Sequence, residues 1–286
     1  MTNLIGRIIH ISPRLPDLLL ADNTTGRNIL FATNSYEHLG EHYLAEREIT
    51  PELITGSNAG IIKPRCLKAK DEQKTRTKKK AEVFTPSWIC NLMNNQCDEA
   101  WFGAPHIFNV SISEKTWEPT TTPIPFTNGK AWKDYVDSLR LEITCGEAPF
   151  LVSRVDTTTG DPIPISHRIG MLDRKLRVVN ENAADEAEWI EWAIRAIQSV
   201  YGYEYQGDNL VIARINILMT FVEYLQDRWS REPTISEIEE VANIIAWNLW
   251  QMDGLKDVPP FNLRACLIFN WRANKSITFE SLKKGA

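Results

Sequence analysis

The chain has 286 residues, of which 43% are hydrophobic, 24% charged and 9% aromatic, and its formal net charge is -5. This composition is typical of a globular protein, and the length excludes a disulfide-stapled mini-protein because a sizeable core can be buried. No apolar run is long enough for a membrane-spanning helix. The acidic balance does not indicate a nucleic-acid partner, although local basic patches steer binding more than the total charge does.

The start of the chain and its cysteines predict a cytoplasmic protein. Residues 1–10 lack the basic start and the long apolar run of a signal peptide. Neither the five cysteines nor the five histidines have metal-ligand spacing, so no metal site is predicted. The cysteines are odd in number and are expected to be reduced thiols: Cys66, Cys90, Cys97, Cys145 and Cys266.

The first quarter of the chain predicts a small module followed by a basic segment. Residues 1–67 alternate short apolar runs with turn residues, which is typical of a mixed or β-rich module. Residues 68–81 are expected to form a linker, because seven of the thirteen residues 68–80 are basic. This segment is either a solvated linker or a phosphate-contacting stretch that uses Lys78, Lys79 and Lys80.

The middle of the chain predicts one helix, one strand and two irregular stretches. Thr85 and Pro86 are typical of a helix start, and apolar residues at helical spacing follow them. Residues 101–133 contain several prolines without periodicity and predict an irregular, packed connection. Residues 139–143 alternate as a strand, and the polar residues 152–182 are rich in turn signals.

The last third predicts alternating strands and helices. Thr234 and Glu237 form a capping box, which marks the start of a helix. The expected elements are a helix over 187–198, a strand over 199–205, a long helix after residue 208, the capped helix from 234 and a short buried strand over 266–269. This order predicts an α/β layer structure with a mostly parallel sheet.

Acidic residues follow or end three of the predicted strands. Glu142 precedes a Thr-Cys-Gly turn, Glu204 ends a Tyr-Gly-Tyr-Glu segment, and Asp253 precedes a glycine. Ligands bind at the carboxyl ends of strands in open α/β sheets, where a carboxylate could accept hydrogen bonds from ribose hydroxyls. Taken singly, Glu142 also fits a plain strand-to-helix turn. Glu204 fits an ion pair with a nearby Lys or Arg, and Asp253 fits an Asp-Gly turn.

Taken in their order along the chain, these segments resemble the motifs of a known family. Glu82-Val83-Phe84-Thr85-Pro86, the Cys-Gly turn, Tyr-Gly-Tyr-Glu and Asp253 resemble, in that order, the adenine-N6 DNA methyltransferases of restriction–modification systems. The resemblance covers residues 82–270 and is greatest to proteins labelled restriction endonuclease subunit M. It implies a Rossmann-like methyltransferase domain over 82–286, with a rim insertion at about 152–186.

The resemblance also implies S-adenosylmethionine as the cofactor and gives several residues a role. Phe84, Thr85 and Pro86 would flank its methionine part. The other implied contacts are Glu142, Cys145 and Gly146 in the loop around the cofactor, Glu204 at the ribose and Asp253 at the adenine.

The sequence departs from the family pattern at two places in this loop. Ala148 stands where the family has a second glycine, and Ile143 replaces a proline. Because the alanine Cβ disfavours a positive φ, we expect either that the backbone takes another path at Ala148 or that the cofactor sits differently.

The catalytic Asn-Pro-Pro-Tyr motif of the family is missing. That motif orients the target amine and stacks on the flipped base. Val258-Pro259-Pro260-Phe261 looks similar, but valine has no amide, so we reject it. Asn270 and Trp271 are the better positional match, with the amide to orient the amine and the indole to stack on the base; both also fit ordinary strand-end residues.

Two functions therefore remain as the leading hypotheses, and a restriction subunit with cleavage activity is a third. The first is an S-adenosylmethionine-dependent adenine-N6 methyltransferase-like subunit of a restriction–modification or phage-defence system, with double-stranded DNA and a restriction or specificity subunit as partners. The alternative is a catalytically incomplete module that binds DNA or a partner subunit. Few residues follow Asn270, so either the N-terminal module or a partner completes the sheet, or the chain is incomplete as an enzyme.

Overall fold

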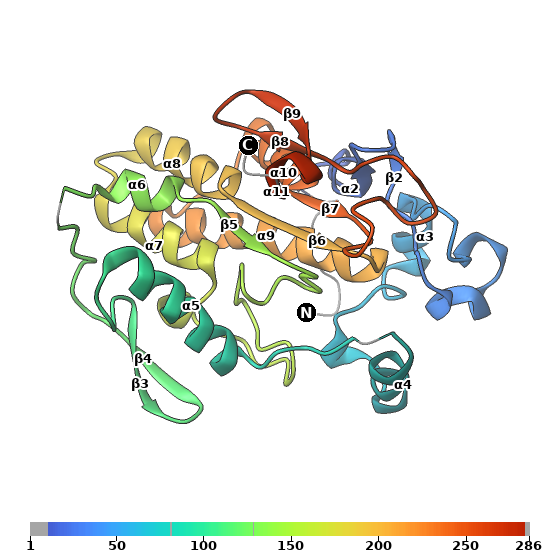
Figure 1. Ribbon diagram of the computed structural model, residues 1–286, viewed down its shortest axis with the longest axis horizontal. Helices are drawn as coiled ribbons and strands as arrows, with labels where there is room; N and C mark the ends of the chain where they lie inside the picture. The colour runs from blue at the N-terminus through green and yellow to red at the C-terminus, as the bar shows by residue number, and fades with distance from the viewer. Residues whose placement is uncertain (1–10, 81, 128, 284–286) are drawn as a thin grey trace.

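The computed structural model describes residues 11–80, 82–127 and 129–283, and it mixes helices with short strands. A parallel sheet of three strands lies at its centre, in the order β5 (Arg140–Glu142), β6 (Val200–Glu204) and β7 (Leu249–Gln251) (Figure 1). Leu141 lies opposite Tyr201, and Glu142 lies opposite Gly202. All three strands therefore end at the same edge of the sheet.

Long helices pack against one face of this sheet, as the periodicity predicts. They are α8 (Glu186–Gln198), α9 (Gly207–Trp229) and α10 (Ile235–Asn248). Val200 and Leu249 point from the strands into the main core beside these helices. The predicted capping box of α10 is confirmed, because the Thr234 hydroxyl accepts the Glu237 N–H at 3.2 Å and the Glu237 carboxylate accepts the Thr234 N–H at 2.7 Å.

A hairpin and a short helix cover part of the opposite face. The hairpin consists of β8 (Leu267–Asn270) and β9 (Lys275–Thr278), and α11 (Phe279–Lys283) follows it. These elements form a second core cluster with Tyr203 of β6 and Trp250 of β7. The strand predicted over 266–269 exists, but it is antiparallel to β9 and lies outside the parallel sheet.

The first quarter of the chain is not β-rich. From residue 11 onward, its strands β1 (Ala21–Asp22) and β2 (Arg27–Asn28) have two residues each, and the other described residues form helical turns and loops. Its apolar residues belong to the same core cluster as α9 and α10. The apolar runs over 18–21 and 29–32 are therefore buried by packing onto these helices rather than by a sheet, and the run over 4–11 lies almost wholly outside the described residues. The helical segments are α2 (Leu15–Leu20), α3 (Pro51–Ile54) and 3-10 turns at Asn34–Leu39, Glu41–Tyr43, Gly56–Asn58 and Arg65–Leu67.

Three predictions for the middle of the chain need correction. The predicted basic linker forms helix α4 (Lys70–Lys80), and the stretch predicted as irregular contains a hairpin of β3 (Asn109–Ser113) and β4 (Thr116–Pro119). The stretch predicted as a rim insertion contains α7 (Met171–Asn182), whose Leu172 and Leu176 are fully buried. The remaining elements are α5 (Ser87–Phe102), α6 (Trp132–Asp137) and a 3-10 turn at Ile165–His167.

Helix α5 begins one residue later than the Thr-Pro pair suggests. Pro86 is its N-cap residue, and Ser87 is the first helical residue. The helix ends at Phe102, and Gly103 follows with a left-handed φ of 76°, which suits the position after a helix. Within the described part of the chain, no helix has the length and apolar character needed to cross a membrane.

Candidate functional site

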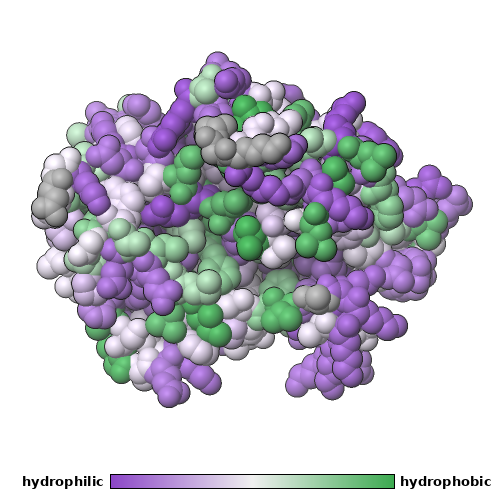
Figure 2. All heavy atoms as spheres, in the orientation of Figure 1, coloured by the Kyte–Doolittle hydropathy of each residue, from purple (hydrophilic) through white to green (hydrophobic). Residues whose placement is uncertain are grey.

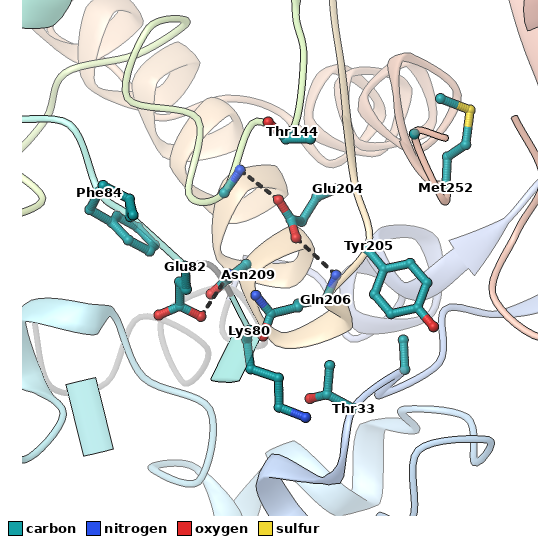
Figure 3. A pocket seen from close by; sticks show the side chains of 14 residues that line it. Thr33, Lys80, Glu82, Phe84, Thr144, Glu204, Tyr205, Gln206, Asn209 and Met252 are labelled. Carbon is teal, nitrogen blue, oxygen red and sulfur yellow. Dashed lines mark hydrogen bonds between the residues drawn. The ribbon is translucent and has the colours of Figure 1, made fainter. Parts of the chain in front are cut away.

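A cavity of about 670 Å³ opens at the carboxyl ends of the three parallel strands (Figure 3). Sites for small molecules occupy roughly 300–1,000 Å³ and favour this edge of an α/β sheet. The cavity joins parts of the chain that are distant in sequence. Its lining includes Thr33, Lys80, Glu82, Val83, Phe84, Thr144, Gly146, Glu204, Tyr205, Gln206, Asn209, Met252 and Gly254.

Glu204, the last residue of β6, reaches the cavity as predicted from the sequence. One carboxylate oxygen accepts the Gly146 N–H at 2.9 Å, and the other accepts the Gln206 N–H at 2.9 Å. Burial raises the pKa of Glu204 to about 7, although these two backbone hydrogen bonds lower it in part. A carboxylate offers about four lone-pair sites, so each oxygen keeps the capacity to accept one further hydrogen bond.

Gly146 and Phe84 face each other at the same cavity. Gly146 has a left-handed φ of 55°, and a Cβ built on it would lie 3.6 Å from the Phe84 ring. The guanidinium carbon of Arg65 lies 5.1 Å from the centre of this ring. The ring is therefore held between a cation and a backbone turn that only glycine adopts without strain.

The conformation of Ala148 contradicts the first alternative, in which the backbone takes another path. Ala148 has a φ of 64°, in the left-handed region, and it is fully buried. Its N–H donates to the Cys145 carbonyl at 2.7 Å, and its carbonyl accepts the N–H groups of Leu151 and Val152. These hydrogen bonds hold the residue in a conformation that costs an L-amino acid roughly 1–2 kcal/mol.

Glu142 and Cys145, both expected to line the cofactor loop, lie behind the cavity instead. The Glu142 carboxylate accepts the N–H groups of Phe150 and Leu151 at 3.4 and 3.1 Å, so it closes the following turn. Burial raises its pKa well above the ordinary range. Cys145 is buried against β6, where its Sγ would lie 3.2 Å from a Cβ on Gly202.

Thr85, Pro86 and Asp253 are neighbours of lining residues and do not line the cavity themselves. The Thr85 carbonyl accepts the Thr157 hydroxyl at 3.2 Å. Asp253 forms a turn in which its carboxylate accepts the Leu255 N–H at 3.0 Å. This is the Asp-Gly turn that the sequence also allowed.

The basic segment contributes one side chain to the cavity. Lys80 lines the cavity and donates to the Asn34 side chain. Lys78 and Lys79 lie exposed on the last turn of α4. Of the three lysines predicted to contact phosphates, Lys80 therefore lines the cavity, and Lys78 and Lys79 do not.

A buried network of charges supports the cavity, and no pattern in the sequence indicates it. Asp208, in the first turn of α9, pairs with Lys68 at 3.0 Å and Arg76 at 2.8 Å. Arg76 also pairs with Glu82 at 2.6 Å, and Tyr36 donates to Asp208 at 2.8 Å. The partners are far apart in sequence, and Lys68 and Arg76 lie in a stretch that looks fully solvated.

Asn270 and Trp271, the predicted catalytic pair, lie away from the cavity. They line a separate groove that also contains Leu139 and Arg140, at the start of β5. The Asn270 side chain accepts the Ala273 N–H at 3.0 Å, and the Trp271 indole donates to the Asn248 side chain at 2.7 Å. The structure therefore places this pair at the amino ends of the parallel strands, opposite the end that carries the cavity.

The described residues contain no cluster of three or more His, Cys, Asp or Glu side chains that could hold a metal ion. A strand-end carboxylate, an aromatic ring and polar amides surround the cavity instead. Comparisons of the chain with protein-family models, curated proteins and solved structures give no match.

Proposed function

We propose that this chain is the S-adenosylmethionine-binding subunit of an adenine-N6 DNA methyltransferase-like system. The observation that carries the proposal is the meeting of Glu204, Gly146 and Phe84 at one cavity on the carboxyl edge of a parallel sheet. Glu204 would accept hydrogen bonds from the ribose hydroxyls. Phe84 and Lys80 would flank the methionine part, with the ammonium of Lys80 close to its carboxylate.

The residues present fit such a group for two reasons. Gly146 has no side chain where a Cβ would narrow the space in front of Phe84. The Glu204 carboxylate is fixed by two backbone N–H groups, so it needs little rearrangement to accept two hydroxyls. When bound, the cofactor supplies a methyl group on a sulfonium for transfer to an amine.

A second candidate function is a related module that binds DNA or a partner subunit without performing chemistry. The position of Asn270 and Trp271 favours it, because neither side chain reaches the cavity. Under this candidate the cavity would be a remnant without affinity for the cofactor.

Calorimetric titration with S-adenosylmethionine distinguishes the two candidates. The first predicts binding that Glu204→Ala weakens by about tenfold or more, since two hydrogen bonds of about 1 kcal/mol each are lost. Glu240→Ala, an exposed glutamate on α10, is the matched control and should bind as the unmodified chain does.

Transfer of labelled methyl groups to mixed-sequence double-stranded DNA is the second measurement. If the chain, alone or with partner subunits, binds S-adenosylmethionine and transfers its methyl group to DNA, the first candidate is supported. Absence of cofactor binding by the folded chain would overturn it, and retained DNA binding would then support the second candidate.

A further inference from the structure

The chain that leaves β5 contains one residue more than the sheet requires. In a regular parallel ladder, N–H groups four residues apart on one strand donate to carbonyls four residues apart on its neighbour. The Arg140 N–H donates to the Ser199 carbonyl at 2.9 Å. The regular donor to the Tyr203 carbonyl would therefore be Thr144. Cys145 makes this bond instead, at 2.8 Å, so the chain bulges by one residue. Bulges of this kind often re-aim a side chain beside a site.

The residue at this bulge, Thr144, has an unusual backbone conformation. Its φ is 46°, in the left-handed region. This value is an outlier for a β-branched residue, because the side chain crowds the backbone there. Gly146, two residues later, has a similar φ of 55° without such crowding. The sequence therefore has a threonine at a position whose backbone favours glycine.

Burial in the core does not account for this strain. Thr144 is exposed, and its neighbour Ile143 is 64% exposed. Figure 2 looks onto the face of the molecule where β5 lies and shows hydrophobic residues at the surface along it. The Thr144 hydroxyl also has no hydrogen bond to another described residue. Strained residues cluster at ligand sites, where the strain serves to place a side chain.

The cavity is the feature that Thr144 faces. It lines the cavity together with Gly146 and Phe84, on the side of β5. Met252 follows β7 directly, and Figure 3 shows it well apart from Thr144. Glu204 ends the central strand β6. A ligand whose ribose lies at Glu204 therefore extends towards β5 with one end and towards β7 with the other.

We propose that the Thr144 hydroxyl is a further ligand contact, which accepts a hydrogen bond from the ammonium group of S-adenosylmethionine. This inference rests on the proposed function, in which Glu204 binds the ribose and Phe84 flanks the methionine part. Because Lys80 lies close to the carboxylate of that part, a neutral oxygen on the β5 side complements its ammonium group. The adenine lies on the β7 side, away from Thr144.

Calorimetric titration with two ligands tests this contact. Methylthioadenosine has the nucleoside and the sulfur of S-adenosylmethionine but no amino-acid part. We expect Thr144→Ala to weaken the binding of S-adenosylmethionine about fivefold and to leave that of methylthioadenosine unchanged. Thr144→Ser keeps the hydroxyl and should bind both ligands as the unmodified chain does. Glu204→Ala is the contrasting variant: it should weaken both, because both carry the ribose.

Thermal unfolding tests the strain separately from the ligand. Thr144→Gly places glycine where the backbone favours it, so we expect the midpoint of unfolding to rise by about 2 °C. The same change removes the hydroxyl and should weaken S-adenosylmethionine as Thr144→Ala does. Thr121→Gly is the matched control, because Thr121 is also exposed but lies outside the left-handed region. It should not raise the midpoint.

Several outcomes would overturn the inference. Unchanged affinity of Thr144→Ala for S-adenosylmethionine would do so, and the proposed function would still stand if Glu204→Ala weakens binding. Equal weakening of the two ligands by Thr144→Ala, or equal weakening by the alanine and serine variants, would also overturn it. A midpoint that falls in Thr144→Gly would show that Thr144 is not strained. If the folded, unmodified chain binds neither ligand, the proposed function fails and this inference falls with it.

Discussion

Glu204 makes the cavity sensitive to pH at the level of a single residue. Its pKa of about 7 means that the carboxyl group gains a proton just below neutral pH. Only the ionised form offers both oxygens as acceptors to ribose hydroxyls. We therefore expect the affinity for S-adenosylmethionine to rise between about pH 6 and pH 8 and then to level off. Calorimetry at a series of pH values measures this.

Glu204→Gln is the control for this pH dependence. Glutamine has nearly the same shape and does not titrate, so its affinity for the cofactor should be lower and constant over the same range. A wild-type affinity that stays flat from pH 6 to pH 8 would contradict the assignment of Glu204 to the ribose.

The contrast between Glu204 and Glu142 shows which part of the site a sequence reveals. Both glutamates were predicted at strand ends, and both predictions of position along the chain are confirmed. The register pairs Glu142 with Gly202, so Glu204 extends two residues further towards the edge of the sheet. Only Glu204 therefore reaches the cavity, and the register that decides this was not visible in the sequence.

The buried Asp208 joins two elements, α4 and α9. Burial alone would raise its pKa, but Lys68 and Arg76 outweigh this and lower the pKa below its ordinary value of 3.8. The stability that the ion pairs of Asp208 contribute is therefore fully present above about pH 3.8, and it is lost as the pH falls through the lowered pKa of Asp208.

Replacing Asp208 by asparagine should destabilise the fold strongly. The change leaves Lys68 and Arg76 buried with fewer counter-charges, and the expected loss is about 3–5 kcal/mol in the free energy of unfolding. Urea denaturation measures the loss, and hydrogen exchange should show faster exchange of the amides of α4. Asp71→Asn, at an exposed position on α4, should change the stability by less than about 0.5 kcal/mol. A loss below about 1 kcal/mol for Asp208→Asn would contradict this view of the network.

The elements that were predicted correctly are those with a strong local signal. Helices α8 and α10 bury an apolar face, α9 is apolar and buried along most of its length, and α10 also has its capping box. Residues 70–80 have no apolar periodicity, and α4 is held instead by Arg76, whose buried guanidinium pairs with the distant Asp208. The β3–β4 hairpin depends in the same way on long-range contacts, such as the Trp117 indole donating to the His167 carbonyl at 2.9 Å.

Helix α4 also presents the cations for a DNA contact under the proposed function. We expect Lys78→Ala combined with Lys79→Ala to weaken binding to double-stranded DNA across all sequences. The slope of log affinity against log salt should become shallower by about 2, since two phosphate contacts are lost. Fluorescence anisotropy at several salt concentrations measures both effects.

The control for the DNA contact is a second pair of exposed lysines. Lys115 lies between β3 and β4, and Lys275 begins β9, both in other parts of the fold. Their replacement by alanine removes the same net charge. An equal loss of affinity in this control pair would show that the effect comes from total charge rather than from α4.

At the scale of the whole molecule, the two parts predicted as separate modules share one core. Leu15, Ile49 and Ile54 belong to the same buried cluster as α9 and α10. Arg214 of α9 donates to the carbonyls of Leu19 and Ala21 at 2.7 and 2.8 Å. A core that continues across both parts should unfold in a single transition.

Tryptophan fluorescence tests this shared core, because all ten tryptophans lie at or after residue 88. Ile49→Ala removes a fully buried side chain from the N-terminal part, at an expected cost of about 2–5 kcal/mol. If the core is continuous, Ile49→Ala lowers the free energy of unfolding measured from the tryptophan signal by this full amount. Ile235→Ala, at a position that is 61% exposed, should shift the transition little. A tryptophan transition that Ile49→Ala leaves in place would instead show that the N-terminal part unfolds independently, as the sequence had suggested.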